Sequence, residues 1–344
     1  MSLTTHRATT NGHAYTPATN ALSFDLEHWY SATLVADAVS NPDDHIEQSV
    51  DLVLDLLADH GVSATFFVVG EVAIEYPDLV RRLVREGHEV GSHGHTHTPL
   101  FELTPEAFER ELSESADAIR SAAGVEPLGF RAPNFSVTRE TAWAFDVLEA
   151  SQYRYDSSVF PVRTPMYGVS DAPTTPYLVT SPTRPFEASA GNCTAGGTDR
   201  LASGVAEFPI SVVETPLESL SSRGIPTRIP FAGGFYARAL PTWLLRRLVR
   251  RQNARGCPVN LYFHPWEFNE RVRVAGLPAH KRFVSYYGLD TTARKLDRLL
   301  SEFDFGTVRS ALASGLDGTG TDTTSNATDR LRRHTDHERH DYRL

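Results

Sequence analysis

The stretch GHEVGSHGHTH, residues 87–97, decides the fold class of this chain. Gly87 ends an apolar helical pattern, residues 88–90 read as the end of a short strand, and three histidines follow within five residues, namely His93, His95 and His97. Strands that end in polar, chemically active residues are typical of parallel α/β folds, where active-site residues collect at the carboxyl ends of the strands. The stretch therefore predicts a parallel α/β fold with a site at this strand end.

Strand and helix patterns alternate on both sides of this stretch. Strands are expected at residues 21–24 and 65–69, the first delivering Asp25 at its end. Helical spacing of apolar residues predicts helices over 46–57, from Pro77, and from Pro105 with Thr104 as the N-cap. Gly61 and Gly124 are expected to end the first and the last of these helices. The alternation indicates βαβ units, which place the strands of one sheet in parallel.

Later segments are less regular. Residues 161–204 are rich in Pro, Thr, Ser and Gly, which predicts long loops rather than a second core. Further strands are expected at 207–210 and 258–263, and a final helix at 292–303. We therefore expect one domain over residues 20–312, between disordered tails at 1–19 and 313–344.

Composition limits the function classes. A net charge of -10 argues against a nucleic-acid partner, and no apolar run is long enough to span a bilayer. The first twenty residues lack the apolar core of a signal peptide, so we expect a cytoplasmic protein. Two cysteines, Cys193 and Cys257, make no disulfide framework and are expected to be bystanders. The oligomeric state is not readable from the sequence.

Two carboxylates and two of the histidines have the composition of a catalytic metal site. Two imidazoles, His93 and His97, with one carboxylate leave a divalent ion with open positions for water and substrate. Asp25 and Glu27 are alternate residues at a strand end, so both side chains can face one pocket, one as ligand and one as base. The alternatives are a hydrogen-bonded turn for the histidines and a solvated loop for the acidic pair. Such a ligand set suits zinc and also tolerates cobalt, nickel or manganese.

Two later residues complete a hydrolytic site. Arg131 stands just before Pro133 and could hold Asp25 ionised through a bidentate contact. His264 directly follows an apolar strand, a place suited to protonating a leaving group. Taken alone, Arg131 would be a surface ion-pair residue and His264 a core residue with its hydrogen bonds satisfied.

The order of these residues resembles the polysaccharide deacetylase family, the NodB-homology group or carbohydrate esterase family 4, over residues 20–310. Residues 23–27, 130–133, 155–158 and 264–267 are similar to a subgroup associated with exopolysaccharide loci. The resemblance implies a deformed (β/α) barrel and metal-dependent removal of N-acetyl groups from an amino sugar, whether in a polysaccharide, an oligosaccharide, or a lipid- or nucleotide-linked precursor. It also implies the following roles: Asp25 as base, Glu27, His93 and His97 as metal ligands, Arg131 orienting Asp25, and His264 as acid.

The chain also departs from the family pattern. The commonest motif has two adjacent aspartates, whereas Asp25 and Glu27 are separated by Leu26, and Tyr262 replaces a common leucine. His28, His95 and the histidines of the C-terminal tail have no assigned role. Two alternatives remain: a metal-free hydrolase of cyclic ureides with the same fold, and a non-catalytic carbohydrate-binding protein. A complete ligand set argues against the first, and the presence of Asp25 and His264 argues against the second.

Overall fold

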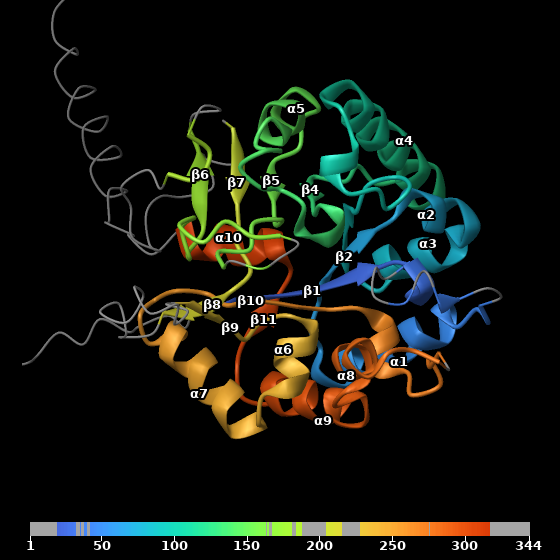
Figure 1. Ribbon diagram of the computed structural model, residues 1–344, viewed down its shortest axis with the longest axis vertical. Helices are drawn as coiled ribbons and strands as arrows, with labels where there is room; N and C mark the ends of the chain where they lie inside the picture. Colours follow the sequence, from blue (N-terminus) through green and yellow to red (C-terminus); the bar gives the residue numbers. More distant parts are fainter. Residues whose placement is uncertain are drawn as a thin grey trace, which may run out of the picture.

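A curled parallel sheet with helices packed around it forms the body of the molecule (Figure 1). The computed structural model describes residues 19–31, 35, 38–39, 42–162, 164, 167–180, 184–187, 204–214, 228–274 and 276–316. Residues 1–18 and 317–344, in which disordered tails were expected, lie outside the described residues. This mixed α/β architecture, whose sheet curls into an incomplete barrel, confirms the predicted fold class.

Among the described residues, the main sheet has nine strands, with eight of them in the order β10-β1-β2-β3-β4-β5-β7-β6 and β11 pairing with β1. All pairs in it are parallel except β6 with β7, while β8 and β9 form a separate antiparallel pair. The strands are β1 (Asn20–Leu26), β2 (Thr65–Val68), β3 (Glu89–Ser92), β4 (Gly129–Phe130), β5 (Tyr155–Asp156), β6 (Tyr177–Val179), β7 (Val205–Glu207), β8 (Val212–Glu214), β9 (Arg228–Pro230), β10 (Asn260–Phe263) and β11 (Phe305–Gly306).

Helices connect most of the parallel strands, as the βαβ pattern requires. They are α1 (Ile46–His60), α2 (Gly70–Glu75), α3 (Pro77–Arg85), α4 (Pro105–Ala123), α5 (Ala144–Ala150), α6 (Gly234–Ala239), α7 (Thr242–Asn253), α8 (Ala279–Tyr286), α9 (Leu289–Leu300) and α10 (Val308–Leu316). Short 3-10 turns, η1 (Trp29–Ser31), η3 (Leu100–Glu102), η4 (Pro133–Phe135) and η7 (Pro265–Phe268), follow several strand ends. No helix in this described part of the chain is long and apolar enough to cross a membrane.

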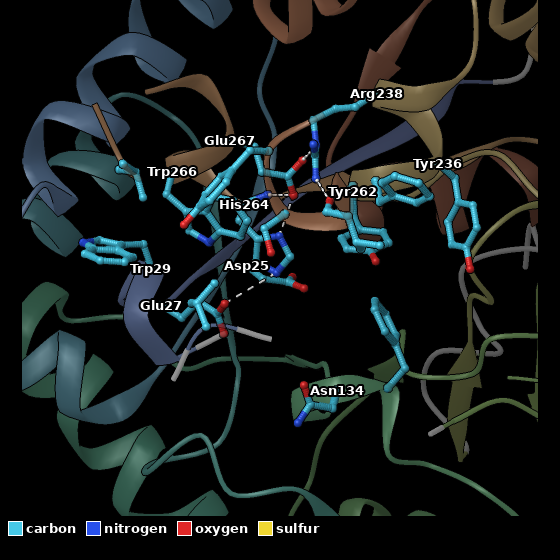
Figure 2. A pocket seen from close by; sticks show the side chains of 18 of the residues that line it. Asp25, Glu27, Trp29, Asn134, Tyr236, Arg238, Tyr262, His264, Trp266 and Glu267 are labelled. Carbon is cyan, nitrogen blue, oxygen red and sulfur yellow. Dashed lines mark hydrogen bonds and ion pairs between the residues drawn. The ribbon is translucent and has the colours of Figure 1, made fainter. Parts of the chain in front are cut away.

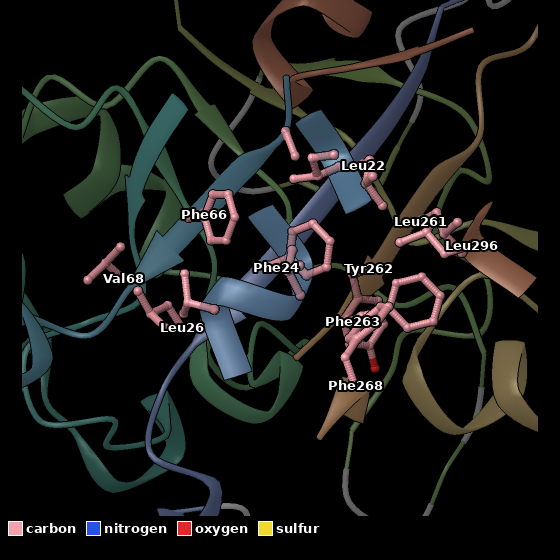
Figure 3. Close-up of a cluster of buried hydrophobic side chains, with 14 of the residues drawn as sticks. Leu22, Phe24, Leu26, Phe66, Val68, Leu261, Tyr262, Phe263, Phe268 and Leu296 are labelled. Atoms are coloured by element: carbon pink, nitrogen blue, oxygen red, sulfur yellow. The ribbon is translucent and has the colours of Figure 1, made fainter. Parts of the chain in front are cut away.

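Strand β1 lies at the centre of the sheet and separates two environments. Leu22, Phe24 and Leu26 point into the main hydrophobic core, where they meet side chains of β2, β10 and η7 (Figure 3). The alternate residues Ser23 and Asp25 therefore face the inside of the curled sheet. Helix α10 packs against residues of this inner side, including Ala21 and Phe67.

The first half of the fold agrees with the sequence predictions. Helix α1 ends at Gly61, whose φ of 62° is the left-handed conformation that glycine adopts easily. Helix α4 begins as predicted, because the Thr104 hydroxyl accepts a hydrogen bond from the backbone of Ala107 at 3.2 Å. Gly124 ends α4 with a φ of 71°.

The second half needs corrections. The strand expected at 207–210 is instead β7 at Val205–Glu207, and β6 lies within the segment expected to be loops. The helix expected at 292–303 is α9, but it is not the last, because α10 continues to Leu316, past the expected domain end at 312. Cys257 is disulfide-bonded rather than a bystander, whereas Cys193 lies outside the described residues.

Candidate active site

The predicted site residues meet at the carboxyl edge of the sheet (Figure 2). Asp25 is the next-to-last residue of β1, and His93, Arg131 and His264 each directly follow the last residue of β3, β4 and β10. These strands are parallel and lie in one part of the sheet, with only β2 between β1 and β3, so their ends deliver the side chains to one place. The structure thus brings together residues that are up to 239 positions apart in the sequence, from Asp25 to His264.

Three residues form a group that could hold a divalent metal. The ligand atoms of Glu27, His93 and His97 all lie within 4.8 Å of one another, and the described residues contain no other such group. His97 Nε2 contacts Glu27 Oε2, and His93 Nε2 lies 4.0 Å from the same oxygen. Two nitrogen donors and one carboxylate fit an ion that keeps open positions.

The orientation of the His93 ring supports its role as a metal ligand. Its Nδ1 donates a hydrogen bond of 2.7 Å to the backbone carbonyl of Arg131, so the lone pair is on Nε2, which faces Glu27 and His97. A ligand histidine is commonly fixed in this way through its second nitrogen. Burial lowers the pKa of His93 to about 4, which keeps the ring neutral at pH 7.

Glu27 is ionised in this setting. Burial acts to raise the pKa of Glu27, but the imidazole of His97, together with His264 and His93, outweighs it and lowers that pKa to about 2. For His97, burial acts to lower the pKa, and the attraction of Glu27 outweighs it, so the pKa is raised. The carboxylate is thus negative at neutral pH, as a metal ligand must be.

The loop that carries His97 is held by a residue that the sequence analysis did not single out. Glu111 of α4 accepts hydrogen bonds from the backbone amides of His95 at 2.7 Å and Thr96 at 2.9 Å. His97 itself has a φ of 60°, a strained value for a residue other than glycine. No local sequence signal marks Glu111, since one exposed-looking glutamate on an amphipathic helix is unremarkable.

Arg131 holds Asp25, although not by the bidentate contact expected from the sequence. Its guanidinium is fully buried, and one nitrogen, Nη1, donates to Asp25 Oδ1 at 2.7 Å and to Ser23 Oγ at 2.9 Å. The other two nitrogens bond Ser157 instead, at its carbonyl oxygen and its hydroxyl. Phe67 lies beneath the guanidinium, with its ring centroid 4.3 Å away. Asp25 is therefore fixed through Oδ1, and the residue lines the cavity.

His264 is positioned by two residues with no role assigned from the sequence. Its Nδ1 lies 2.7 Å from Glu267 Oε1, and Glu267 in turn accepts a 2.8 Å hydrogen bond from Arg238 Nε. Burial acts to lower the pKa of His264, but Glu267, Glu27 and Asp25 raise it to about 9. His264 is therefore protonated at neutral pH, with Nε2 3.6 Å from Glu27 Oε1.

Of the unassigned histidines, His28 and His95 have partners outside the metal-ligand group, and those of the C-terminal tail lie outside the described residues. His28 pairs with Glu75 at 3.0 Å and stacks on Tyr30, and His95 lies 3.9 Å from Glu114. Tyr262, in contrast, lines the same cavity as Asp25, because it is two residues before His264 and on the same side of β10.

Comparison with known protein families shows which family model this chain matches. The polysaccharide deacetylase model matches residues 37–154, which include His93, His97 and Arg131. The chain carries a polysaccharide deacetylase domain. A second model, described as a domain of unknown function (DUF3473), matches residues 157–313, which include His264.

Curated relatives of the deacetylase domain carry matching names. A chitooligosaccharide deacetylase of Rhizobium leguminosarum bv. trifolii is 44% identical over 102 residues, which are 29% of this chain and 43% of that protein. A peptidoglycan-N-acetylglucosamine deacetylase of Bacillus cereus is 33% identical over 81 residues, 24% of this chain and 30% of that protein. The chain thus spans less than half the length of these relatives.

One solved structure has the same fold as this chain over nearly the whole length of both. It was determined for a Mycobacterium smegmatis protein assigned to the polysaccharide deacetylases, with a TM-score of 0.52 and 20% sequence identity. The match covers 90% of this chain and 99% of that one. The polysaccharide deacetylase fold therefore extends beyond residues 37–154 into the region of the second family model.

Proposed function

We propose that this chain is a metal-dependent amide hydrolase that removes N-acetyl groups from an amino sugar. The observation that carries the proposal is the pair of proton-handling groups around the Glu27, His93 and His97 ligands: Asp25 held by Arg131, and His264 held by Glu267. The deacetylase names of the curated relatives support the same reaction. The sugar stands in a polysaccharide, an oligosaccharide, or a lipid- or nucleotide-linked precursor.

Asp25 and His264 each have neighbouring charges that suit them to transfer a proton in this reaction. Asp25 lies against the permanent positive charge of Arg131, and as an ionised carboxylate it can accept the proton of the attacking water. His264 has a raised pKa, so it begins protonated and can donate to the amine nitrogen as the C–N bond breaks. Water thus adds to the carbonyl carbon, and acetate and the free amine leave.

The metal would be held by Glu27, His93 and His97. When bound there, a divalent ion would polarise the amide carbonyl and lower the pKa of a water molecule. The ligand set suits zinc best and also tolerates cobalt, nickel or manganese. The three ligand residues lie close together, which argues against a metal-free ureide hydrolase. The presence of two proton carriers argues against a purely binding role.

The direct test measures metal content together with acetate release from an N-acetylglucosamine oligomer, with and without a chelator. Release that stops with chelator and returns with added metal supports the proposal. Bound metal without release from any N-acetylated sugar would contradict the reaction, and a purified protein that takes up no metal would favour the ureide hydrolase.

The cytoplasmic location expected from the sequence stays a prediction. The disulfide at Cys257 is more typical of an oxidising compartment, because cytosolic thiols are kept reduced. Fractionation of cells that make the protein from its own gene separates the two locations.

A further inference from the structure

A row of aromatic rings runs from the candidate active site towards the surface of the molecule. It begins at Tyr262, whose ring centroid lies 5.9 Å from that of His264 and 4.8 Å from that of Phe135. Tyr167 lies 6.0 Å from Phe135, and Phe160 stacks on Tyr167 at 5.6 Å. These rings are buried or half-buried, so this part of the row belongs to the interior.

The row reaches solvent on helices α6 and α8. Tyr236 lies 6.1 Å from Phe160 and 5.6 Å from Phe235, which in turn lies 5.8 Å from Phe283. Phe283 and Tyr287 are four residues apart, so they lie on one side of the end of α8, with their ring centroids 4.8 Å apart. Phe283 is 52% exposed and Tyr287 is 48% exposed. We call these two residues the outer aromatic pair.

The outer aromatic pair is fixed relative to the candidate active site. Arg238 donates hydrogen bonds to the backbone carbonyls of Val284 and Tyr287, and it also bonds Glu267. Glu267 is the residue that positions His264. The end of α8 is therefore tied through one buried guanidinium to the proposed proton donor.

The pair also adjoins the cavity of the candidate active site. Phe235, which contacts Phe283, and Val284, which follows it in the chain, both line this cavity of about 380 Å³. Such a volume lies within the range of pockets that enclose whole small-molecule ligands, so a complete sugar ring can enter. Trp266, in another wall, has a buried Nε1 with no hydrogen-bond partner among the described residues. A sugar in the cavity thus meets a donor as well as aromatic rings.

A second sugar has the chemistry that suits the outer aromatic pair. The flat face of a sugar ring presents C–H groups, whose slight positive charge packs well against the negative face of an aromatic ring. Covering the exposed rings also removes apolar area from water. The hydroxyl groups at the rim of the sugar stay hydrated at such an exposed place, so they need no buried partner. A sugar linked to the one in the cavity would therefore gain free energy there.

We propose that the outer aromatic pair binds the sugar residue next to the one that is deacetylated. The inference rests on the proposed function and narrows its substrate to a chain of at least two sugars. One sugar lies in the cavity with its N-acetyl group beside Asp25 and His264, and its neighbour stacks on Phe283 and Tyr287. Residues 157–313, matched by the model of unknown function, would then supply this part of the substrate binding.

A chain-length series on the metal-loaded full chain tests this inference. The substrates are N-acetylglucosamine and its oligomers of two to five residues, and the measurement is kcat/KM for amine release. We expect kcat/KM to rise about three- to tenfold when the sugar chain becomes long enough to cover the outer aromatic pair. The double variant Phe283→Ala, Tyr287→Ala should lose this gain. As a matched control, Trp243→Ala removes an exposed ring of α7 that does not line the cavity, and it should keep the gain.

The series separates failure of this inference from failure of the proposed function. A gain with chain length that is the same in all three proteins, or a kcat/KM that does not depend on length, would overturn the inference and leave the proposed function standing. No release from any of the substrates would overturn the proposed function itself.

A binding measurement gives a readout that does not depend on turnover. The full-length Asp25→Asn protein is titrated with the five-residue oligomer by calorimetry. Adding Phe283→Ala and Tyr287→Ala should raise the Kd about three- to tenfold, whereas adding Trp243→Ala should leave it unchanged. An equal Kd in the presence and absence of the outer aromatic pair would contradict the inference.

An anionic lipid surface is the alternative occupant, because Lys281 and Arg282 directly precede Phe283. The sugar is favoured because Val284, Ser285 and Tyr286 of the same helix face the cavity, which leaves few side chains for a membrane. Sedimentation with phosphatidylglycerol vesicles distinguishes the two occupants. Vesicle binding that the double variant loses, together with an unchanged Kd for the oligomer, would assign the pair to lipid and overturn the inference.

Discussion

Asp25 and His93 are both buried at the carboxyl edge of the sheet, yet their contacts give them different functions in the site. Asp25 Oδ1 accepts a hydrogen bond from Arg131, and Asp25 is not a member of the metal-ligand group. His93 points Nε2 into that group because its Nδ1 is engaged with a backbone carbonyl. At the scale of single residues, this separates a proton carrier from a ligand.

We therefore expect Asp25→Asn to keep bound metal but lose turnover by a factor of at least 10²–10⁴. His93→Ala should lose both metal and turnover, because two remaining ligands hold a divalent ion poorly. Metal content by mass spectrometry and amine release, measured on the same preparations, distinguish the two variants. A His93→Ala protein with one metal per chain would disprove the ligand assignment.

Glu267 offers a second test at this scale. Glu267→Gln removes the negative charge that holds the protonated ring of His264, while leaving a side chain of the same size. We expect kcat to fall about 10–100-fold, as for other residues that position a catalytic group, with metal content unchanged. As a matched control, Glu109→Gln changes an exposed glutamate of α4 and should leave kcat as it was. Equal kcat in the two variants would show that Glu267 does not act through His264.

The site residues predicted from the sequence lie at strand ends, whereas the residues that were missed lie on helices. Asp25, His93, Arg131 and His264 each follow or end an apolar strand, so a linear pattern marks them. Glu111 and Arg238 lie on helices and act only on neighbours brought close by the fold. Their roles depend on packing distances, which a single sequence does not contain.

At the scale of elements, strands β5 and β7 bring two carboxyl groups together in the interior. Asp156 and Glu207 are partners in the parallel register, and both are fully buried. Glu207 also accepts a hydrogen bond from Val159 N at 3.0 Å, and Ser158 links Asp156 to Ala132 N, beside Arg131. Among the described residues, no donor reaches Asp156 Oδ2 or Glu207 Oε2, so we expect one of the two carboxyl groups to keep its proton at neutral pH.

This pair predicts how stability depends on pH. Burial and the nearby Asp156 charge raise the pKa of Glu207 well above its ordinary value near 4.5, while Arg131 partly opposes this and Tyr177 faces the same pair. The folded state thus keeps a proton that the unfolded chain loses above pH 4.5. Raising the pH from that value therefore lowers the free energy of unfolding, by at most about 1.4 kcal/mol per pH unit for one proton.

We expect Glu207→Gln to reduce this loss, because an amide stays neutral at every pH. Urea unfolding of both proteins between pH 5 and 9 measures the effect, and the free energy of unfolding should fall less with pH in the variant. The exposed-site variant Glu109→Gln should follow the unmodified protein. Parallel pH curves for Glu207→Gln and the unmodified protein would show that the pair carries no extra proton.

The predicted helices and strands agree best with the structure where the local sequence pattern is strong. Helices α1 and α4 have strong apolar periodicity and a glycine directly after them, and both were predicted within a few residues. Strands β6 and β7 have only three residues each, and their place depends on an edge pairing far from any local signal. Helix α10 was missed because its apolar residues pack inside the curled sheet, an environment that exists only after folding.

At the scale of the whole molecule, the two matched family segments contribute strands to the same sheet. Strand β1 precedes both segments, yet it lies between β10 of the second and β2 of the first. The candidate site is likewise divided: Asp25 and Glu27 come from the segment around β1, and His264 from the second family segment. One sheet therefore unites three parts of the sequence.

This arrangement predicts that residues 37–154 alone do not fold. Without β1, the edge of β2 is exposed, and the core loses Leu22, Phe24 and Leu26. Burial of each such side chain contributes about 1.5–3 kcal/mol, whereas a whole domain is stable by only about 5–15 kcal/mol. We expect the fragment to aggregate or to lack a cooperative thermal transition by circular dichroism. Residues 19–316, which contain every described strand and helix, should keep that transition and bind metal. A soluble 37–154 fragment that melts cooperatively would instead mean that the deacetylase segment is an independent domain, to which β1 and β10 only add the remaining site residues.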